Sequence, residues 1–197
     1  MNLIDIRKDL AHRITDPIVR ILSKSGITPN ALTFINLALN IVAAYVIATG
    51  HFLLGGVLVL VAGLFDLLDG ALARFTKQTT RFGAILDSVA DRISEAAILC
   101  GILIWYIPQE DTSLEIVLIF VVLIGSFLVS YIRARAEGLG WQCQVGLFTR
   151  AERVIVLAIG LLVNQIFIAL CVLAVFVFIT VVQRLVYLWK QGNIKGD

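Results

Sequence analysis

The 197-residue chain is strongly apolar: 59% of its residues are hydrophobic and only 15% are charged. Soluble domains average about 45–50% apolar and about 25% charged residues. The composition therefore excludes an ordinary soluble enzyme and predicts an all-α integral membrane protein. The formal net charge of +2 carries little information by itself, and we expect no nucleic-acid partner.

A basic amphipathic segment comes first. Apolar residues recur at helical spacing from Leu3 to Ile21, with arginines, lysines and a histidine between them. A helix of this kind lies in the membrane interface with its basic side toward anionic headgroups. We assign residues 1–27 to this juxtamembrane segment, which fits a surface anchor as well as a role in lipid entry.

Apolar stretches long enough for membrane-crossing helices, roughly 20 residues each, follow from Thr28, a typical helix cap before Pro29. The expected helices cover residues 30–49, 52–77, 82–106 and 114–136. The last stretch, 151–189, is too long for one crossing. We divide it at Asn164 and Gln165 into a short fifth helix and a sixth. Residues 28–190 thus form a six-helix transmembrane domain, and 191–197 form a short tail.

The basic residues are distributed asymmetrically. All 16 lysines and arginines fall on one side of this arrangement, whereas the acidic segment Pro108–Glu115 lies on the other. Because basic residues are retained on the cytoplasmic side, we expect a multi-pass protein of the cell membrane with both termini in the cytoplasm. The loop between the second and third helices then faces the cytoplasm.

An aspartate-rich run interrupts the second and third expected helices, with the pattern D-x2-D-G-x2-A-R-x8-G-x3-D-x3-D. A carboxylate at membrane depth is costly and by default marks a functional site. The spacing places the members on one face of each helix. They are Asp66, Asp69, Gly70, Ala73 and Arg74 on the second helix, and Gly83, Asp87 and Asp91 on the third.

Four carboxylates on two facing helices can hold a pair of hard cations. Oxygen ligands suit Mg²⁺ or Mn²⁺, and Mg²⁺ usually takes further ligands from substrate phosphates. Gly70 and Ala73 remove bulk from the motif face, and Arg74 offers a planar donor fork to a phosphate. The run therefore predicts metal-dependent chemistry on a phosphorylated ligand, with access from both bilayer and cytosol.

Other classes of membrane protein also use intramembrane carboxylates. A proton relay or a packing role explains one aspartate, but not four with glycines and an arginine on the same faces. An ion-coupled transporter usually has matching interrupted helices in two halves, whereas this run lies in two adjacent helices. Intramembrane prenyltransferases need a second aspartate-rich motif, and none follows Asp91. A catalytically idle lipid-binding protein would need damage outside the motif.

With all eight fixed positions present, the run resembles the signature of the CDP-alcohol phosphotransferases (CDP-alcohol phosphatidyltransferases), membrane enzymes that attach phospholipid headgroups. The resemblance implies CDP-diacylglycerol as donor, CMP as leaving group, a hydroxyl compound as acceptor, and a homodimer. It implies Asp66, Asp69 and Asp87 as metal ligands, and Asp91 as both a ligand and the catalytic base. The residues that it implies for the CDP-lipid are Asn30, Ala31, Leu32, Thr33, Gly70, Arg74 and Thr80. Asn36 and Asn40 extend a polar stripe from this strip, and helix packing explains them equally well.

A second group of polar residues lies on the later helices. Ser126, Ser130, Arg133 and Glu137 form a stripe on the fourth helix, Arg150 and Arg153 open the fifth, and Arg184 lies inside the apolar sixth. Arg135 and Arg150 fit equally well as ordinary basic flanks. Arginines from three helices would form an anion pocket beside the metals. Such a pocket indicates an acceptor that already carries a phosphate.

The segments S-Y-I-R-A-R-A-E, R-A-E-R and Q-R-L around these arginines resemble one subgroup of the family, the phosphatidylinositol-phosphate synthases of bacteria and archaea. Their acceptor is inositol 1-phosphate, and Arg133, Arg153 and Arg184 match the residues that bind its phosphate. The main alternative is phosphatidylglycerol-phosphate synthase, which uses glycerol 3-phosphate. That group typically has L-D-P-x-A-D-K where this chain has L-D-S-V-A-D-R, from Leu86 to Arg92. The sequence leaves open a diacyl or an archaeal ether donor, and Mg²⁺ or Mn²⁺.

Overall fold

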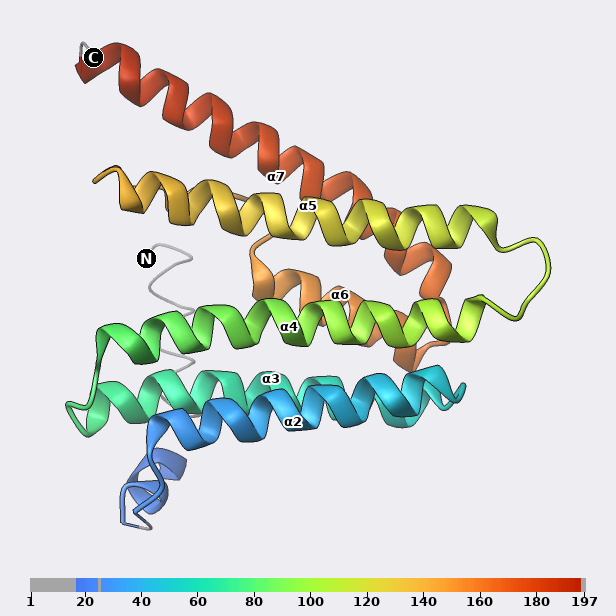
Figure 1. Ribbon diagram of the computed structural model, residues 1–197, viewed down its shortest axis with the longest axis horizontal. Helices are drawn as coiled ribbons and strands as arrows, with labels where there is room; N and C mark the ends of the chain where they lie inside the picture. The colour runs from blue at the N-terminus through green and yellow to red at the C-terminus, as the bar shows by residue number, and fades with distance from the viewer. Residues whose placement is uncertain (1–16, 25, 196–197) are drawn as a thin grey trace.

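The structure, a computed structural model, describes residues 17–24 and 26–195. All regular elements in these ranges are helices, which confirms the all-α prediction. Residues 17–22 are helical, and α2 (Pro29–Ala48), α3 (Phe52–Phe75), α4 (Arg81–Tyr106), α5 (Ser113–Gly138), α6 (Arg150–Leu162) and α7 (Ile166–Lys195) follow (Figure 1). Most of the expected amphipathic segment, residues 1–16, lies outside the described residues, as do residues 25 and 196–197.

The helix boundaries lie within one turn of the predicted ones, except at the end of α7. That helix continues to Lys195, through residues that we expected to form a tail. The predicted break between the last two helices is confirmed. Asn164 adopts a left-handed conformation (φ 54°), and the Gln165 N–H donates to the Gly160 carbonyl at 2.7 Å. This pattern closes the carboxyl end of α6 and turns the chain into α7.

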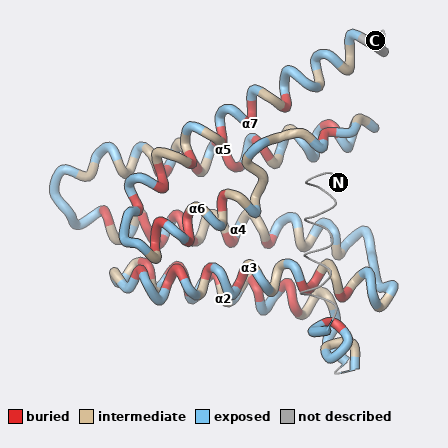
Figure 2. Tube along the Cα trace, turned by 180° about the vertical axis from the view of Figure 1, so that it is seen from behind, coloured by how far each residue is buried: buried red, intermediate tan, exposed pale blue. Residues whose placement is uncertain are grey.

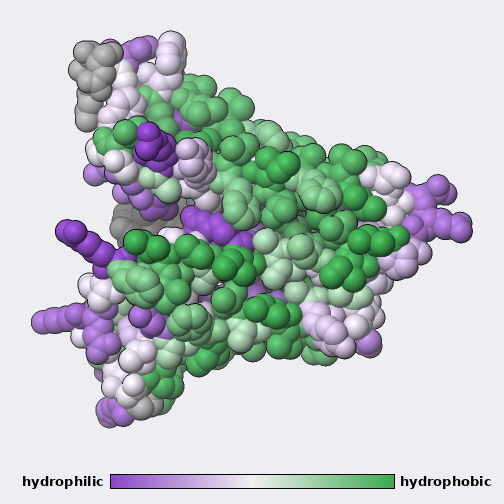
Figure 3. Space-filling view, viewed as in Figure 1, coloured by the Kyte–Doolittle hydropathy of each residue, from purple (hydrophilic) through white to green (hydrophobic). Residues whose placement is uncertain are grey.

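In the described part of the chain, four helices, α2, α3, α5 and α7, are long and apolar enough to cross a membrane. The other two expected crossings do not meet that criterion, for different reasons. The first half of α4 carries the charged residues of the aspartate run, and α6 has 13 residues, which rise only about 20 Å. In the space-filling view, hydrophobic residues cover the middle of the molecule and hydrophilic residues gather at its two ends (Figure 3).

The helices pack side by side around one main core. α2 packs against both α3 and α4, α6 packs against α3 and α7, and α5 packs against α7 and α4. Buried and exposed positions alternate along each helix, as expected where one face is packed (Figure 2). Gly101 of α4 lies against the backbone of Ala44 in α2, where a Cβ atom would collide. The core includes Ile47, Val59, Ile102, Val122, Leu161 and Leu170.

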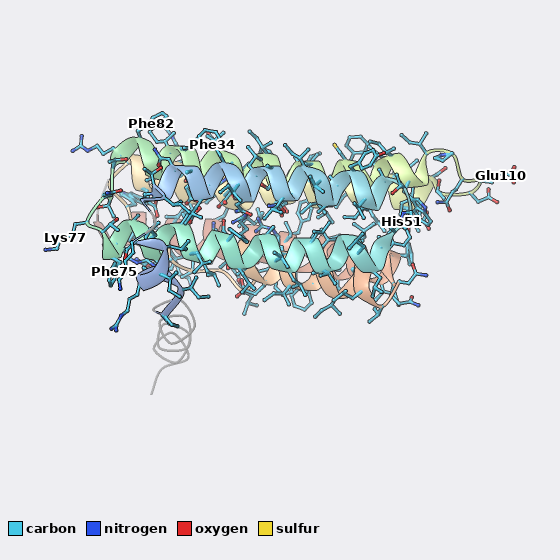
Figure 4. All side chains as sticks on the ribbon, turned by 90° about the horizontal axis from the view of Figure 1, so that it is seen from below. Phe34, His51, Phe75, Lys77, Phe82 and Glu110 are labelled. Atoms are coloured by element: carbon cyan, nitrogen blue, oxygen red, sulfur yellow. The ribbon has the colours of Figure 1, made fainter. Side chains whose placement is uncertain are left out.

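Along α4 the main core begins at Ile98, after the last aspartate of the run. The core therefore lies in the half of the bundle toward the carboxyl end of α4. The opposite part holds the polar residues of the motif. The basic loop after α3 and the acidic connection after α4 lie at opposite ends of the bundle, as Lys77 on one side and His51 and Glu110 on the other make visible (Figure 4). The motif thus lies toward the basic end.

Candidate active site

Three motif carboxylates converge between α3 and α4. One oxygen from each of Asp66, Asp69 and Asp87 lies within 4.8 Å of the other two. The short connection between the helices brings them together, and Thr80 caps α4 by accepting a hydrogen bond from the Gly83 N–H at 2.9 Å. An oxygen-only donor set at this separation fits hard divalent cations such as Mg²⁺ or Mn²⁺.

α2 positions two of these carboxylates. The Thr33 hydroxyl donates to Asp69 Oδ2 at 3.0 Å, and the Asn36 amide donates to Asp66 Oδ1 at 3.2 Å. The Asn40 amide donates in turn to Asn36 Oδ1 at 2.9 Å, so the Asn36 carbonyl is occupied and its NH₂ group faces Asp66. The polar stripe on α2 therefore contacts the aspartates directly, which packing between helices alone would not require.

Thr33→Val is expected to lower the affinity for Mn²⁺ by about 10–100-fold, the usual cost of losing a hydrogen bond that orients a metal ligand. Valine keeps the shape of threonine at this buried position but cannot donate to Asp69. Titration of free Mn²⁺ by electron paramagnetic resonance measures the change. Thr49→Val, at the other end of α2, is the matched control and should bind Mn²⁺ like the wild type.

Asp91 pairs with an arginine. Arg150 NH1 lies 2.7 Å from Asp91 Oδ1 and 2.6 Å from Asp66 Oδ1, so this guanidinium bridges α4 and α3. Arg150 is the first residue of α6, and a capping box formed by Thr149 and Glu152 fixes that helix start. From the sequence, Arg150 fitted an ordinary basic flank as well as a site residue. The sequence analysis did not predict its contact with two motif aspartates.

A cavity of about 190 Å³ opens beside the three aspartates, between the start of α2, the end of α3 and the start of α4. Five of the seven residues predicted for the CDP-lipid line it: Asn30, Thr33, Gly70, Arg74 and Thr80. A Cβ atom at Gly70 would lie 3.4 Å from Arg74 NH1, and one at Gly83 would lie 2.9 Å from Thr80 Oγ1. Glycine at both positions therefore keeps the cavity open next to its polar groups.

The other two predicted residues lie elsewhere. Leu32 is 1% exposed and packs in a small apolar cluster with Leu68 and Leu72. Ala31 is half-buried, and its N–H donates to the capping hydroxyl of Thr28 at 3.3 Å. Neither is among the residues that line the cavity. Their positions correspond to packing and to the helix start.

A second cavity, of about 300 Å³, lies on the other side of Asp87 and Asp91, between α4, α5, α6 and α7. Five arginines from four helices line it: Arg92, Arg133, Arg150, Arg153 and Arg184. A hydrophilic patch is visible between the α4 and α5 layers, with hydrophobic surface above it, below it and to its right (Figure 3). The structure thus brings together the three arginines predicted for the acceptor phosphate, and it adds Arg92 and Arg150.

These arginines differ in how far their donors are already used. Arg153 makes two hydrogen bonds to Glu95, at 2.7 and 2.8 Å, and is 3% exposed. Arg184 donates to the backbone carbonyls of Val129 and Val145 and is equally buried. Arg133 is more than half exposed and pairs with Glu137 one turn along its own helix.

Glu95 is a site residue that the sequence reasoning missed. Its carboxylate lines the arginine cavity and fixes the guanidinium of Arg153. A signal was available, because Glu95 continues the four-residue spacing of Gly83, Asp87 and Asp91 by one more turn. The same face of α4 therefore carries the motif carboxylates and the partner of Arg153.

An apolar groove of about 420 Å³ runs between α3 and α6 and ends at the carboxylates. Its walls include Leu60, Gly63, Leu64, Leu67, Val154 and Ile155, and Asp66, Asp91 and Arg150 lie at its polar end. A polar cavity, an arginine-lined cavity and an apolar groove therefore meet at one carboxylate cluster. This arrangement can bind a lipid phosphate and a second anionic molecule side by side.

Comparison with known proteins agrees with this geometry. The family model of CDP-alcohol phosphatidyltransferases matches residues 26–187. The chain belongs to this family. Its relatives include the phosphatidylinositol phosphate synthase of Mycobacteroides abscessus, 36% identical over 88% of this chain and 82% of the relative. The archaetidylinositol phosphate synthase of Pyrococcus horikoshii is 38% identical, over 87% of this chain and 90% of the relative.

Solved structures of this family share the fold. The phosphatidylinositol phosphate synthase of Mycobacterium tuberculosis with CDP-DAG bound superposes with a TM-score of 0.81 at 36% identity, covering 90% of this chain and 94% of that one. The same enzyme in complex with manganese and citrate also gives a TM-score of 0.81, at 35% identity, covering 89% of this chain and 88% of that one. Membership of the family makes this chain a CDP-alcohol phosphatidyltransferase in class.

Proposed function

We propose that this protein transfers the phosphatidyl group of CDP-diacylglycerol to a hydroxyl of 1D-myo-inositol 1-phosphate (inositol 3-phosphate in the alternative numbering), giving phosphatidylinositol phosphate and CMP. The observation that carries the proposal is the arginine-lined cavity beside Asp87 and Asp91, opposite the cavity of Arg74 and Thr80. A neutral acceptor such as glycerol, serine or inositol does not need a cavity lined by five arginines. An acceptor that carries a phosphate does.

The donor fits the first cavity and the groove. Asn30, Thr33, Gly70, Arg74 and Thr80 surround space for the cytidine diphosphate, and the groove between α3 and α6 offers an apolar path for its acyl chains. Both spaces end at the carboxylates, so the pyrophosphate of a bound donor lies there. The complex of the Mycobacterium tuberculosis enzyme with CDP-DAG supports the donor assignment.

Asp66, Asp69 and Asp87, with Asp91 beside them, are the residues that would hold two divalent cations, Mg²⁺ or Mn²⁺. When bound, such cations neutralise the pyrophosphate charge and stabilise the leaving CMP. Thr33 and Asn36 keep Asp69 and Asp66 oriented toward that position. The manganese complex of the related enzyme supports a divalent cation in this family.

The reaction is an in-line substitution at the β-phosphorus, which bears the diacylglycerol. The acceptor oxygen forms a new bond to this phosphorus, and the bond to the oxygen that leaves with CMP breaks. Asp91, which lines the arginine cavity, takes the proton of the attacking hydroxyl. The arginines hold the acceptor phosphate away from the bilayer and set the hydroxyl toward Asp91.

The placement in the membrane is part of the proposal. Six helices cross or enter the bilayer, with the basic end of the bundle and the active site at the cytoplasmic face. The positions of Lys77 and Glu110 at opposite ends (Figure 4) fit the rule that basic residues stay in the cytoplasm. The protein acts as a homodimer, as the family resemblance implies.

Release of CMP by the purified protein in detergent, with CDP-diacylglycerol and Mg²⁺, tests the function. Inositol 1-phosphate, glycerol 3-phosphate, inositol and serine are offered in parallel. CMP formed only with inositol 1-phosphate is the expected result. CMP release with glycerol 3-phosphate alone would identify the alternative, a phosphatidylglycerol-phosphate synthase. The lack of CMP release with all four acceptors would contradict the proposed activity. The same assay with an archaeal ether lipid in place of CDP-diacylglycerol compares the two donor classes.

Arg133→Gln is expected to raise the KM for inositol 1-phosphate by about 10–100-fold, since one hydrogen bond to a charged group contributes roughly 1.5–3 kcal/mol. The KM for CDP-diacylglycerol should stay within about twofold. Arg133 is the most exposed of the five arginines that line the cavity, so the variant should fold normally. Arg135→Gln makes the same charge change on the same helix outside the cavity and is the control. If both variants change the KM for inositol 1-phosphate equally, Arg133 does not bind the acceptor.

A further inference from the structure

Arg150 occupies a special position among the arginines of the acceptor cavity. Arg153, Arg184 and Arg133 are held by partners outside the aspartate run: Glu95, backbone carbonyls and Glu137, respectively. Arg92 donates to the Ser88 carbonyl of its own helix and reaches Asp91 alone, at 3.8 Å. Arg150 instead bridges two carboxylates of the aspartate run, with Asp66 of α3 at 2.6 Å and Asp91 of α4 at 2.7 Å. Its guanidinium therefore depends on the same oxygens that a divalent cation would use.

Arg150 also belongs to both sides of the site. Its side chain lines the acceptor cavity together with Arg133 and Arg184, and it lines the polar end of the groove together with Asp66 and Asp91. Its Nε atom is buried and has no hydrogen-bond partner, although a buried donor is normally satisfied. The side chain thus has an unused donor while it borders a cavity suited to a phosphate.

A guanidinium and a divalent cation repel each other at short range, because like charges a few ångströms apart cost energy even with partial solvent screening. A cation that binds Asp66 and Asp91 therefore weakens the pairing of Arg150 with these carboxylates. A phosphate in the adjacent cavity offers the same guanidinium a new anionic partner. The side chain need not leave its place, because it already borders that cavity.

We infer that Arg150 couples the two halves of the site, competing with divalent cations for Asp66 and Asp91 and pairing with the acceptor phosphate once a cation has bound these carboxylates. The inference rests on the proposed function, because it assumes a phosphorylated acceptor. Coupling between two ligands is reciprocal. The acceptor therefore tightens cation binding, and the cation tightens acceptor binding, through one side chain at the start of α6.

The test measures Mn²⁺ binding without turnover. Full-length protein in detergent is titrated with Mn²⁺ in the absence of donor lipid, with and without inositol 1-phosphate, and free Mn²⁺ is read by electron paramagnetic resonance. In the wild type, inositol 1-phosphate should tighten Mn²⁺ binding by at least about fivefold. In Arg150→Gln, Mn²⁺ alone should bind at least about fivefold tighter than in the wild type, and inositol 1-phosphate should change the affinity by less than about twofold.

Arg135→Gln is the matched control and should behave like the wild type in both titrations. Arg150→Met, with a neutral side chain of similar length, provides the same test if the glutamine variant does not fold. Full coupling retained in either Arg150 variant, or weaker binding of Mn²⁺ alone, would overturn the inference. Failure of the proposed function has a separate readout: the wild-type protein would release no CMP with any acceptor. The titration with Mn²⁺ alone contains no acceptor, so its result does not depend on the proposed function.

Discussion

Asp91→Asn is expected to lower kcat by at least about 100-fold, because a positioned general base contributes roughly 10²–10⁴-fold to a rate. Asp91 is not one of the three aspartates whose oxygens lie within 4.8 Å of one another, and its Oδ1 atom pairs with Arg150. It also lines the acceptor cavity, where the attacking hydroxyl must approach. Asparagine keeps the size of aspartate but cannot take a proton, so CDP-diacylglycerol should still bind with nearly wild-type affinity.

Single-turnover CMP release and equilibrium binding of the donor together measure this variant. Asp111→Asn is the control for the substitution itself, because Asp111 lies in the connection after α4 with φ 57°, a conformation that asparagine tolerates. It should turn over like the wild type. If Asp91→Asn keeps kcat within about tenfold of the wild type, Asp91 is not the base.

Asp69→Asn is expected to abolish detectable turnover and to weaken Mn²⁺ binding by at least about 100-fold. Loss of a residue that merely orients a metal ligand already costs about 10–100-fold, and Asp69 is predicted to bind the cation itself. Its carboxylate is 4% exposed and accepts hydrogen bonds from Thr33 and from the Gly70 N–H. The asparagine side chain removes the charge without leaving a cavity.

The two aspartate variants are distinguished by comparing Mn²⁺ titration with turnover. Asp69→Asn should lose both, whereas Asp91→Asn should lose turnover by a larger factor than it loses Mn²⁺ affinity. Circular dichroism and size-exclusion chromatography establish that each variant is folded. Wild-type Mn²⁺ affinity in Asp69→Asn would show that the three clustered carboxylates do not form the cation site.

Features that depend on local spacing could be predicted from the sequence. The helical period places Asp66 and Asp69 on one face of α3 and Asp87 on the facing side of α4, so their convergence follows from two helices joined by a short loop. The break at Asn164 follows from length, because one helix cannot use nearly 40 apolar residues in a single crossing. The cap at Thr28 follows from the chemistry of helix ends.

Contacts between distant segments could not be predicted in this way. Arg150 reaches Asp66 and Asp91 only because α6 packs against α3, and no pattern in one sequence specifies that packing. The pairing of Arg153 with Glu95 joins residues 58 positions apart, although the four-residue spacing after Asp91 could have indicated Glu95. Leu32 is a different case, because a continuous strip on a helix necessarily includes a position that faces the core.

The most direct test of the account is the lipid made from a mixture of acceptors. Purified protein in detergent is given CDP-diacylglycerol and Mg²⁺ with equal concentrations of inositol 1-phosphate and glycerol 3-phosphate, and the lipid products are identified by mass spectrometry. The account predicts phosphatidylinositol phosphate, with two phosphates per molecule and one CMP released for each, as the main product. Phosphatidylglycerol phosphate as the main product, or no new lipid, would contradict it.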